Sequence, residues 1–275
     1  MKSKWIDGFM YTVLGFASLF FITPLLYVVL TSFKTENEIF RVPQSLLPDA
    51  LYTGNYEAIF KASNSFLRYF ANSTIITVTG VFIVLVLSAL AGYGFARLPF
   101  RGSGVMLAAI LMTITIPLAV FLVPIYLMED AWGILNTNLG LILPNVAVVL
   151  PFAIFIMRAN YIGIPKELEE AALIDGCGIF RTWWNIMLPL VKNGSVIVII
   201  HAFYNIWGEY TLAKSLATKP DAMPLTVGLT LFKGEVWAFG MLSSVIVLSM
   251  LPPIIIFLIF QKQLIEGISQ GAVKG

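Results

Sequence analysis

Three polar side chains recur at a four-residue spacing in a segment that is otherwise mostly apolar. His201, Asn205 and Glu209 follow one another at this interval, and Tyr204 adds an aromatic ring beside them. In an α-helix, residues four apart lie along one face, with a drift of about 40° per step. Imidazole, amide and carboxylate groups can hydrogen-bond a polar solute. The pattern therefore predicts either a helix face that lines a solute path or one that hydrogen-bonds neighbouring membrane helices.

Other kinds of site find little support in the sequence. His201 is the single histidine and Cys177 the single cysteine, which excludes an intramolecular disulfide and a His/Cys metal cluster. The chain contains no Gly-x-x-x-x-Gly-Lys-Ser/Thr run, so we do not expect it to hydrolyse ATP by itself. No pair of carboxylates, and no nucleophile with an adjacent base, is suggested at membrane depth. We expect no catalytic residue and no metal site in this chain.

The composition is that of a membrane protein. Of the 275 residues, 59% are hydrophobic and 12% are charged, against about a quarter charged in a typical soluble domain. A soluble fold of this size could not bury so much apolar surface, whereas lipid can solvate it. The net charge is +2 and there is no basic tract, so nothing indicates a nucleic-acid partner. We predict an all-α integral membrane protein in contact with membrane lipid, with residues 1–275 as a single membrane domain.

Six apolar stretches are long enough to cross a bilayer, which takes roughly 20 residues in a helix. The first follows a basic N-terminus and could be read as a signal peptide. It is longer than a signal core and no small-x-small cleavage site follows, so we expect an uncleaved helix. Prolines occur inside the third and fourth stretches, and Pro252-Pro253 predicts a kink in the sixth. The predicted spans are 9–33, 70–96, 105–128, 139–157, 195–212 and 241–260.

The charges of the short connections predict the orientation of these spans. The connection from Arg97 to Arg101 is short and basic, whereas the one that contains Glu129 and Asp130 is short and acidic. The positive-inside rule then places both termini in the cytoplasm. Two longer connections, 34–69 and 213–240, would lie outside. They could form a docking surface for an external partner or serve as ordinary connectors.

A cytoplasmic loop over residues 161–190 is predicted to fold as a helix, a turn and a second helix. Pro165 suits a first helical turn, and the three glutamates that follow it favour the positive end of the helix dipole. Asp175-Gly176 should end the first helix, since glycine takes the left-handed conformation at little cost. A second helix is expected over 180–188, stopping before Pro189.

The first helix of this loop is acidic and carries small residues, which favours a protein partner. A helix lying on the membrane surface usually has Lys or Arg on its polar face. Small residues such as Ala171 and Ala172 let another surface approach closely, and Ile174 offers an apolar contact. Glu170 offers a carboxylate to a basic side chain of the partner.

The loop resembles the EAA loop of the permease subunits of binding-protein-dependent ABC importers. The resemblance rests on Glu170-Ala171-Ala172, three further residues, Gly176, and the later pair Leu188-Pro189. The chain ends in Gly267-Ile-Ser-Gln-Gly-Ala-Val-Lys-Gly, which is similar to the tail of the smaller maltose-type permeases of the carbohydrate-uptake group. Asn205-Ile-Trp-Gly-Glu-Tyr also resembles the family's fifth-helix pattern, with Gly208 where Asn is common. Cys177 stands where the family usually has Ala.

The resemblance implies a five-helix permease core over 70–265 and an assembly in a bacterial or archaeal cytoplasmic membrane. The implied partners are a second, homologous permease, two ATPase subunits that bind ATP and Mg²⁺, and an extracytoplasmic sugar-binding protein. No cofactor is expected in this chain. The implied coupling residues are Glu170, Ala171, Ala172, Ile174, Asp175 and Gly176. The tail 267–275 is expected to reach the ATPase interface through Gly271, Ala272, Val273, Lys274 and Gly275, and the solute path is expected to include His201, Tyr204, Asn205 and Glu209.

The residues alone are also compatible with three alternatives to a sugar importer. A secondary transporter or channel would need a coupling-ion site at mid-membrane, for which only Glu209 qualifies. A membrane-embedded enzyme would need a catalytic constellation that the sequence does not suggest. Within the family, importers of other polar solutes such as amino acids or peptides share the loop, and glycerol-phosphate importers carry similar tails. The predicted spans contain no Lys or Arg, which favours a neutral sugar or oligosaccharide over an anion.

Overall fold

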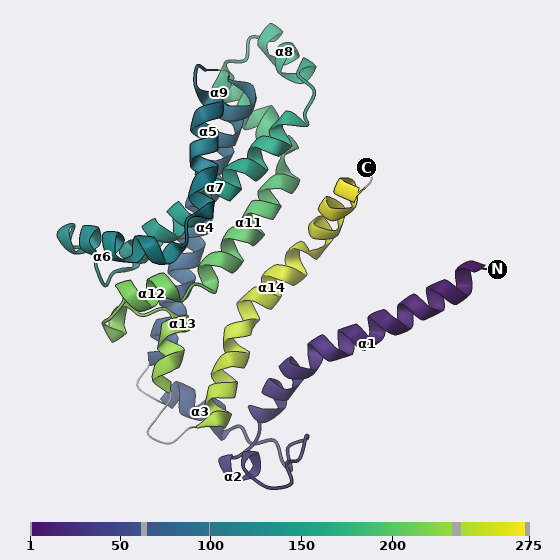
Figure 1. The fold of residues 1–275 in the computed structure, drawn as a ribbon, viewed down its shortest axis with the longest axis vertical. Helices are drawn as coiled ribbons and strands as arrows, with labels where there is room; N and C mark the ends of the chain where they lie inside the picture. The colour runs from purple at the N-terminus through teal and green to yellow at the C-terminus, as the bar shows by residue number, and fades with distance from the viewer. Residues whose placement is uncertain (1, 62–64, 99, 233–237, 273–275) are drawn as a thin grey trace. The chain divides into compact units, whose positions relative to one another are not determined.

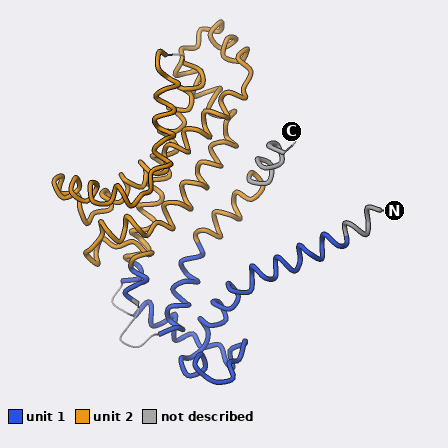
Figure 2. Tube along the Cα trace, viewed as in Figure 1, with its two compact units in different colours: residues 1–67, 228–251 blue, residues 68–227, 252–275 orange. Residues whose placement is uncertain are grey.

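The computed structural model describes residues 2–61, 65–98, 100–232 and 238–272, and every regular element in these ranges is helical (Figure 1). The chain divides into two compact units (Figure 2). The first comprises residues 1–67 and 228–251, and the second comprises residues 68–227 and 252–275. The all-helical membrane fold predicted from composition is confirmed for the described residues.

Four helices are long and apolar enough to cross a membrane by themselves. They are the apolar parts of α1 (Lys2–Thr31) and α14 (Phe239–Ala272), together with α4 (Ser65–Arg97) and α7 (Asn138–Ile162). The spanning parts of α1 and α14 are Gly8–Thr31 and Phe239–Gln263. These four agree with the predicted spans 9–33, 70–96, 139–157 and 241–260. Counting each of two bent helix pairs as one further span gives six.

The predicted span over 105–128 is sharply bent in the structure. Ser103–Thr115 and Leu118–Ala131 are two helical segments bent by 98°, with α5 (Ser103–Met112) and η1 (Thr113–Thr115) before the bend and η2 (Leu118–Phe121) and α6 (Leu122–Ala131) after it. Ile116 is extended, with φ −85° and ψ 123°. A residue that precedes proline is pushed out of the helical region by the proline ring, and Pro117 also lacks the N–H that would continue the helix.

The predicted fifth span, 195–212, is displaced and shorter in the structure. α11 runs over Lys192–Trp207, and a separate short helix, α12, covers Thr211–Leu216. The predicted cytoplasmic helix over 180–188 does not stop before Pro189 but continues through it. It consists of α9 (Ile179–Thr182), a π-helical turn η3 (Trp183–Met187) and α10 (Leu188–Leu190), and it meets α11 at a 76° bend. Pro189 follows directly on the π-helical turn, which already interrupts the regular α-helical hydrogen-bond pattern that a proline, lacking an N–H, could not continue.

Glycines bring α4, α7 and α11 close together in the core of the second unit. A Cβ built on Gly92 of α4 would lie 2.7 Å from Cβ of Met157 and 2.9 Å from the backbone nitrogen of Arg158, both in α7. In α11, a Cβ on Gly194 would lie 2.5 Å from the Asn160 side chain. Small residues at such crossings let membrane helices approach closely enough for dispersion contacts to hold them. The core around these crossings is fully buried at Val84, Ala153, Met157, Val198 and Ala202.

The first unit is held together by polar contacts around the end of α1. Asn55 in α3 (Gly54–Lys61) donates from Nδ2 to the carbonyl oxygens of Ser32 and Lys34, at 2.9 and 2.8 Å. The hydroxyl of Ser244 in α14 donates to the same Ser32 carbonyl. The Glu36 carboxylate accepts from the backbone N–H of Gly240 at 2.8 Å. The predicted external connection 34–69 is therefore ordered against the start of α14 in its described part.

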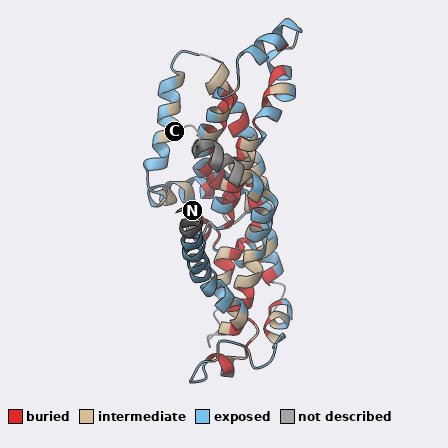
Figure 3. Ribbon diagram, turned by 90° about the vertical axis from the view of Figure 1, so that its right-hand side faces the viewer, coloured by how far each residue is buried: buried red, intermediate tan, exposed pale blue. Residues whose placement is uncertain are grey.

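Apart from Thr31 at its end, the apolar part of α1 has no buried residue within this chain, although it is apolar on all sides (Figure 3). An apolar face that no part of its own chain covers must be covered by lipid or by another subunit. The helix is consequently typical of an element that lies in the membrane.

Candidate functional site

The predicted coupling helix is present as α8, which runs over Glu167–Ile174 and carries three glutamates in its first turn. Gly176 follows it with φ +78°. The backbone N–H groups of Cys177 and Gly176 donate to the carbonyl oxygens of Ala172 and Leu173, at 2.9 and 3.0 Å. This hydrogen-bond pair is the Schellman C-cap that a left-handed glycine permits. The predicted helix and its end at Asp175-Gly176 are confirmed.

Most of the predicted coupling residues lie on the exposed side of α8. Glu170 is exposed and makes no recorded ion pair or side-chain hydrogen bond among the described residues. Ile174 is 86% exposed, which is high for a large apolar side chain. Ala172, by contrast, is buried and faces the rest of the second unit. The remaining members of the predicted set, Ala171, Asp175 and Gly176, are exposed.

Sequence reasoning missed the pair of charged groups that attaches α8 to the helical core. The Arg97 Nε at the end of α4 lies 3.5 Å from Oε2 of Glu169, and their side chains are only 5% and 16% exposed. Arg97 also donates from Nη2 to the carbonyl oxygen of Tyr161 at 2.7 Å and to that of Ile164, at the C-terminal end of α7. The glutamates of α8 thus differ, since Glu169 pairs with Arg97 within the chain, whereas Glu170 is exposed and has no ion pair among the described residues.

The second half of the cytoplasmic loop is anchored by aromatic residues. Trp183 Nε1 donates to the hydroxyl of Tyr161 at 3.0 Å, and the Tyr161 ring packs edge-on against Tyr93, with centroids 5.5 Å apart. Two further aromatic side chains of this half, Phe180 and Trp184, are 69% and 57% exposed. The loop therefore combines a fixed inner side with an apolar and acidic outer side.

Two of the four predicted path residues line a large cavity in the second unit. His201 and Asn205 face a space of about 670 Å³ between the bent segment 110–125 and the middle of α7. The ring of Phe152 lies 4.4 Å from that of His201, centroid to centroid. Asn205 donates from Nδ2 to the His201 carbonyl oxygen at 2.8 Å. The lining is otherwise mostly aliphatic and contains no charged side chain among the described residues.

The other two predicted path residues are engaged elsewhere. The Tyr204 hydroxyl donates to the Pro253 carbonyl oxygen of α14 at 2.9 Å. Glu209 lies beyond the end of α11, and its two carboxylate oxygens accept the backbone N–H groups of Leu212 and Ala213, at 2.6 and 2.9 Å. These contacts satisfy donors at the start of α12 that have no partner inside the helix.

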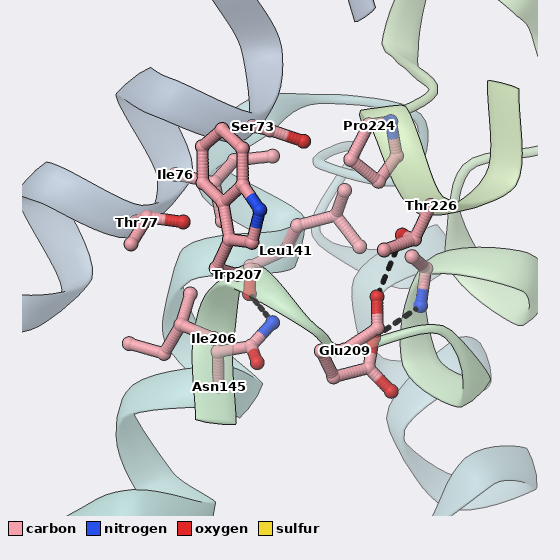
Figure 4. A pocket seen from close by; sticks show the side chains of 11 residues that line it. Ser73, Ile76, Thr77, Leu141, Asn145, Ile206, Trp207, Glu209, Pro224 and Thr226 are labelled. Carbon is pink, nitrogen blue, oxygen red and sulfur yellow. Dashed lines mark hydrogen bonds between the residues drawn. The ribbon is translucent and has the colours of Figure 1, made fainter. Parts of the chain in front are cut away.

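Glu209 borders a second, much smaller cavity, of about 10 Å³, between α4, α7 and the end of α11 (Figure 4). Figure 4 shows Ser73 and Thr77 on one side of it and Glu209 with Thr226 on the other. The Thr226 hydroxyl donates to the Glu209 carbonyl oxygen at 2.7 Å. This volume suits about one water molecule and excludes a sugar.

The side chain of Asn136 connects the loop that precedes α7 to the loop that follows α12. Asn136 adopts a left-handed conformation, with φ 62°, which asparagine tolerates better than most residues. Its Oδ1 accepts the backbone N–H groups of Thr218 and Lys219, at 2.7 and 2.8 Å. Residues 216–219 of the predicted external connection 213–240 are therefore held against the loop that precedes α7.

The predicted ATPase-interface tail lies mostly outside the described residues. Gly271 and Ala272 end α14, and Val273, Lys274 and Gly275 lie outside the described residues. Among the described residues, no group of three His, Cys, Asp or Glu side chains could hold a metal ion.

Comparison with known proteins identifies the class to which this arrangement belongs. Residues 84–270 match the sequence model of the family described as "Binding-protein-dependent transport system inner membrane component". The chain is 34% identical over 260 residues to the diacetylchitobiose uptake system permease protein NgcG of Streptomyces coelicolor, covering 94% of this chain and 85% of that protein. It is 31% identical over 261 residues to the arabinooligosaccharides transport system permease protein AraQ of Bacillus subtilis, covering 94% and 92%.

The fold is also found in a solved transporter. A chain of a bacterial ABC transporter involved in the import of the acidic polysaccharide alginate superposes with a TM-score of 0.81, at 22% identity, over 95% of this chain and 98% of that one. The present chain belongs to the family of inner-membrane permease components of binding-protein-dependent ABC transport systems. It is a multi-pass membrane subunit of such a system.

Proposed function

We propose that this chain is one of two homologous permease subunits of an ABC importer that moves a neutral sugar or oligosaccharide into the cytoplasm. Two separate ATPase subunits bind ATP and Mg²⁺ and supply the energy, and an extracytoplasmic binding protein delivers the solute. The proposal draws on relatives whose names specify diacetylchitobiose and arabinooligosaccharides. Another relative is named for sulfoquinovosyl glycerol, so the family's solutes are not all neutral.

The observation that carries this proposal is the free outer side of α8. An exposed carboxylate at Glu170, next to exposed Leu173 and Ile174, is the arrangement expected of a helix that inserts into a cleft of another protein. A charge-assisted hydrogen bond to Arg or Lys strengthens when the contact is desolvated. When the ATPase dimer closes, movement of its clefts would displace α8 and rock the helices attached to it between inward-open and outward-open arrangements.

The cavity beside His201 and Asn205 is the proposed solute path through this subunit. It has room for a sugar ring, and it offers an amide, an imidazole and the ring of Phe152. The amide and the imidazole can form hydrogen bonds with the hydroxyl groups of a sugar, and the apolar face of the sugar can pack on the aromatic ring. Because the lining contains no Lys or Arg, the negative charge of an anionic solute would have no cationic partner there. The cavity therefore favours a neutral solute. Tyr204 and Glu209 stay predictions as path residues, because Tyr204 is hydrogen-bonded to α14 and Glu209 to the start of α12.

Replacing Asn205 with Leu should raise the KM for uptake about 2- to 10-fold, since one neutral hydrogen bond contributes about 0.5–1.5 kcal/mol. The matched control is Asn193→Leu, an asparagine of the same helix that does not line the cavity. Initial uptake rates in proteoliposomes measure both. An equal effect of the two substitutions, or none at position 205, would argue against this cavity as the path.

The function itself is tested by uptake into proteoliposomes that contain the complete transporter and its binding protein. A panel of N,N′-diacetylchitobiose, arabinooligosaccharides, maltooligosaccharides and glycerol 3-phosphate is offered in competition. We expect a neutral oligosaccharide to compete best and uptake to stop when the ATPase subunits are inactivated in their Walker motifs. Uptake that persists without ATP hydrolysis would indicate a secondary transporter or channel, and preference for glycerol 3-phosphate would reject the neutral solute.

A further inference from the structure

Arg97 is the point at which three elements of the second unit meet. It is the last residue of α4, and its guanidinium reaches both the C-terminal end of α7 and the first turn of α8. The Tyr161 carbonyl oxygen also accepts the backbone N–H of Ile164 at 3.2 Å, so Arg97 adds a second donor at this helix end, where the last carbonyls have no partner within the helix. A cation placed there also complements the negative end of the α7 dipole.

The rest of α8 has few other attachments to the core. Ala172 is the one residue of α8 that is buried. The Arg97–Glu169 pair is the one ion pair that α8 makes within the described part of the chain. The connection from α7 to α8 is a short turn that contains Gly163 and Pro165. A load applied to the outer side of α8 therefore reaches the core through the backbone, through Ala172 and through Glu169, which interacts with Arg97 and with the Tyr93 side chain of α4.

How strongly the Arg97–Glu169 pair can hold α8 depends on how well the two side chains are shielded from water. An exposed ion pair contributes little, about 0–1 kcal/mol, because water screens it and the side chains lose freedom. The side chains of Arg97 and Glu169 are only 5% and 16% exposed. Removing one partner of such a pair leaves a desolvated charge and costs much more than the loss of a surface pair.

We propose that Arg97 and Glu169 form a tether that transmits the displacement of α8 to α4 and α7. They are positioning residues and touch neither solute nor nucleotide. The inference rests on the proposed function, since it assumes that an ATPase partner engages α8. It assigns different roles to adjacent glutamates, with Glu170 receiving the displacement and Glu169 passing it to the helices that cross the membrane.

The tether itself is tested on the full-length chain in detergent, without any partner. Trypsin can cleave at Lys166 and Arg181, which are exposed on either side of α8. In Arg97→Gln and Glu169→Gln, α8 should separate from the core more often, and cleavage at these two sites should be several-fold faster. Glu167→Gln is the matched control, because Glu167 lies in the same turn, is exposed and forms no recorded ion pair. Unchanged cleavage in both tether variants would overturn the proposal.

Transmission is tested in the assembled transporter by the stimulation of ATP hydrolysis on adding the binding protein. Each tether variant should lower this stimulation about tenfold, within the usual range of coupling between sites. The double variant should be no worse than the worse single variant, because both remove the same interaction. Arg97→Lys keeps the charge beside Glu169 and should recover part of the stimulation, which a role in folding alone would not predict.

The outcomes separate this inference from the proposed function. If Glu170→Ala abolishes stimulation while Glu169→Gln leaves it intact, α8 engages the ATPase and the tether is wrong. If additive effects appear in the double variant, Arg97 and Glu169 act separately and the tether is likewise wrong. If neither Glu170→Ala nor the tether variants change ATP hydrolysis although trypsin cleavage rises as expected, the contact exists and the proposed function fails.

Discussion

Glu170→Ala should leave the protein inserted and folded but lower solute uptake by at least about tenfold. The side chain is exposed and has no recorded partner among the described residues, so its removal costs the isolated chain little. In the proposed complex its carboxylate would be desolvated against a basic side chain. Truncating one partner of a buried, hydrogen-bonded charge pair at an interface costs about 2–5 kcal/mol. Uptake and co-purification of the ATPase subunits measure the loss.

Glu167→Ala is the matched control for this experiment. Glu167 lies in the same first turn of α8 and is also exposed. Its loss removes a similar favourable interaction with the helix dipole, about 0.3–1 kcal/mol. Near-normal uptake in Glu167→Ala with strongly reduced uptake in Glu170→Ala would therefore isolate the partner contact. Full uptake in Glu170→Ala would remove the main support for the coupling role of α8.

Gly92→Ala should destabilise the folded chain by about 1–3 kcal/mol, although alanine is the better helix former. The added Cβ would lie 2.7 Å from Cβ of Met157 and 2.9 Å from the backbone nitrogen of Arg158. The backbone of α7 cannot yield as a flexible side chain would, so α4 and α7 must move apart and lose their contacts. Unfolding by denaturant in mixed micelles measures the change in free energy.

Gly94→Ala provides a control of the opposite sign. Gly94 lies in the same helix two residues later, and a Cβ built there meets nothing within 4 Å. Alanine should stabilise this position by up to about 1 kcal/mol, because glycine loses more conformational freedom on entering a helix. Equal effects at positions 92 and 94 would contradict the close crossing of α4 and α7.

The elements that follow from local chemistry were predictable from the sequence. Long apolar runs predicted the spanning helices α1, α4, α7 and α14, because burial of backbone polar groups in lipid allows little besides a helix. The end of α8 was predictable because Asp175-Gly176 provides a local capping signal. Its exposed Glu170 followed from the acidic composition of the loop.

The positions at which prediction failed depend on breaks in helices and on contacts between distant residues. The spacing of His201, Asn205 and Glu209 defines one face only while the helix continues, and α11 ends at Trp207. Glu209 consequently does not share the helix face of His201 and Asn205, whereas its place in the solute path stays a prediction. The bend before Pro117 had a signal in the sequence, yet proline in a membrane helix is compatible with both a kink and a break. Pairing of Arg97 with Glu169 had no signal at all, because nothing local to either residue specifies its partner.

The bend at Ile116-Pro117 also determines which side of the second unit can face the lipid. Residues 113–117 are exposed within this chain, and the regular α-helical hydrogen-bond ladder is interrupted there. Hydrocarbon tails offer no hydrogen bonds, so irregular backbone at membrane depth is tolerated only where protein or water covers it. Acyl chains are thereby excluded from this part of the second unit. The bilayer must contact the chain elsewhere, and the exposed apolar surface of α1 is suited to that contact.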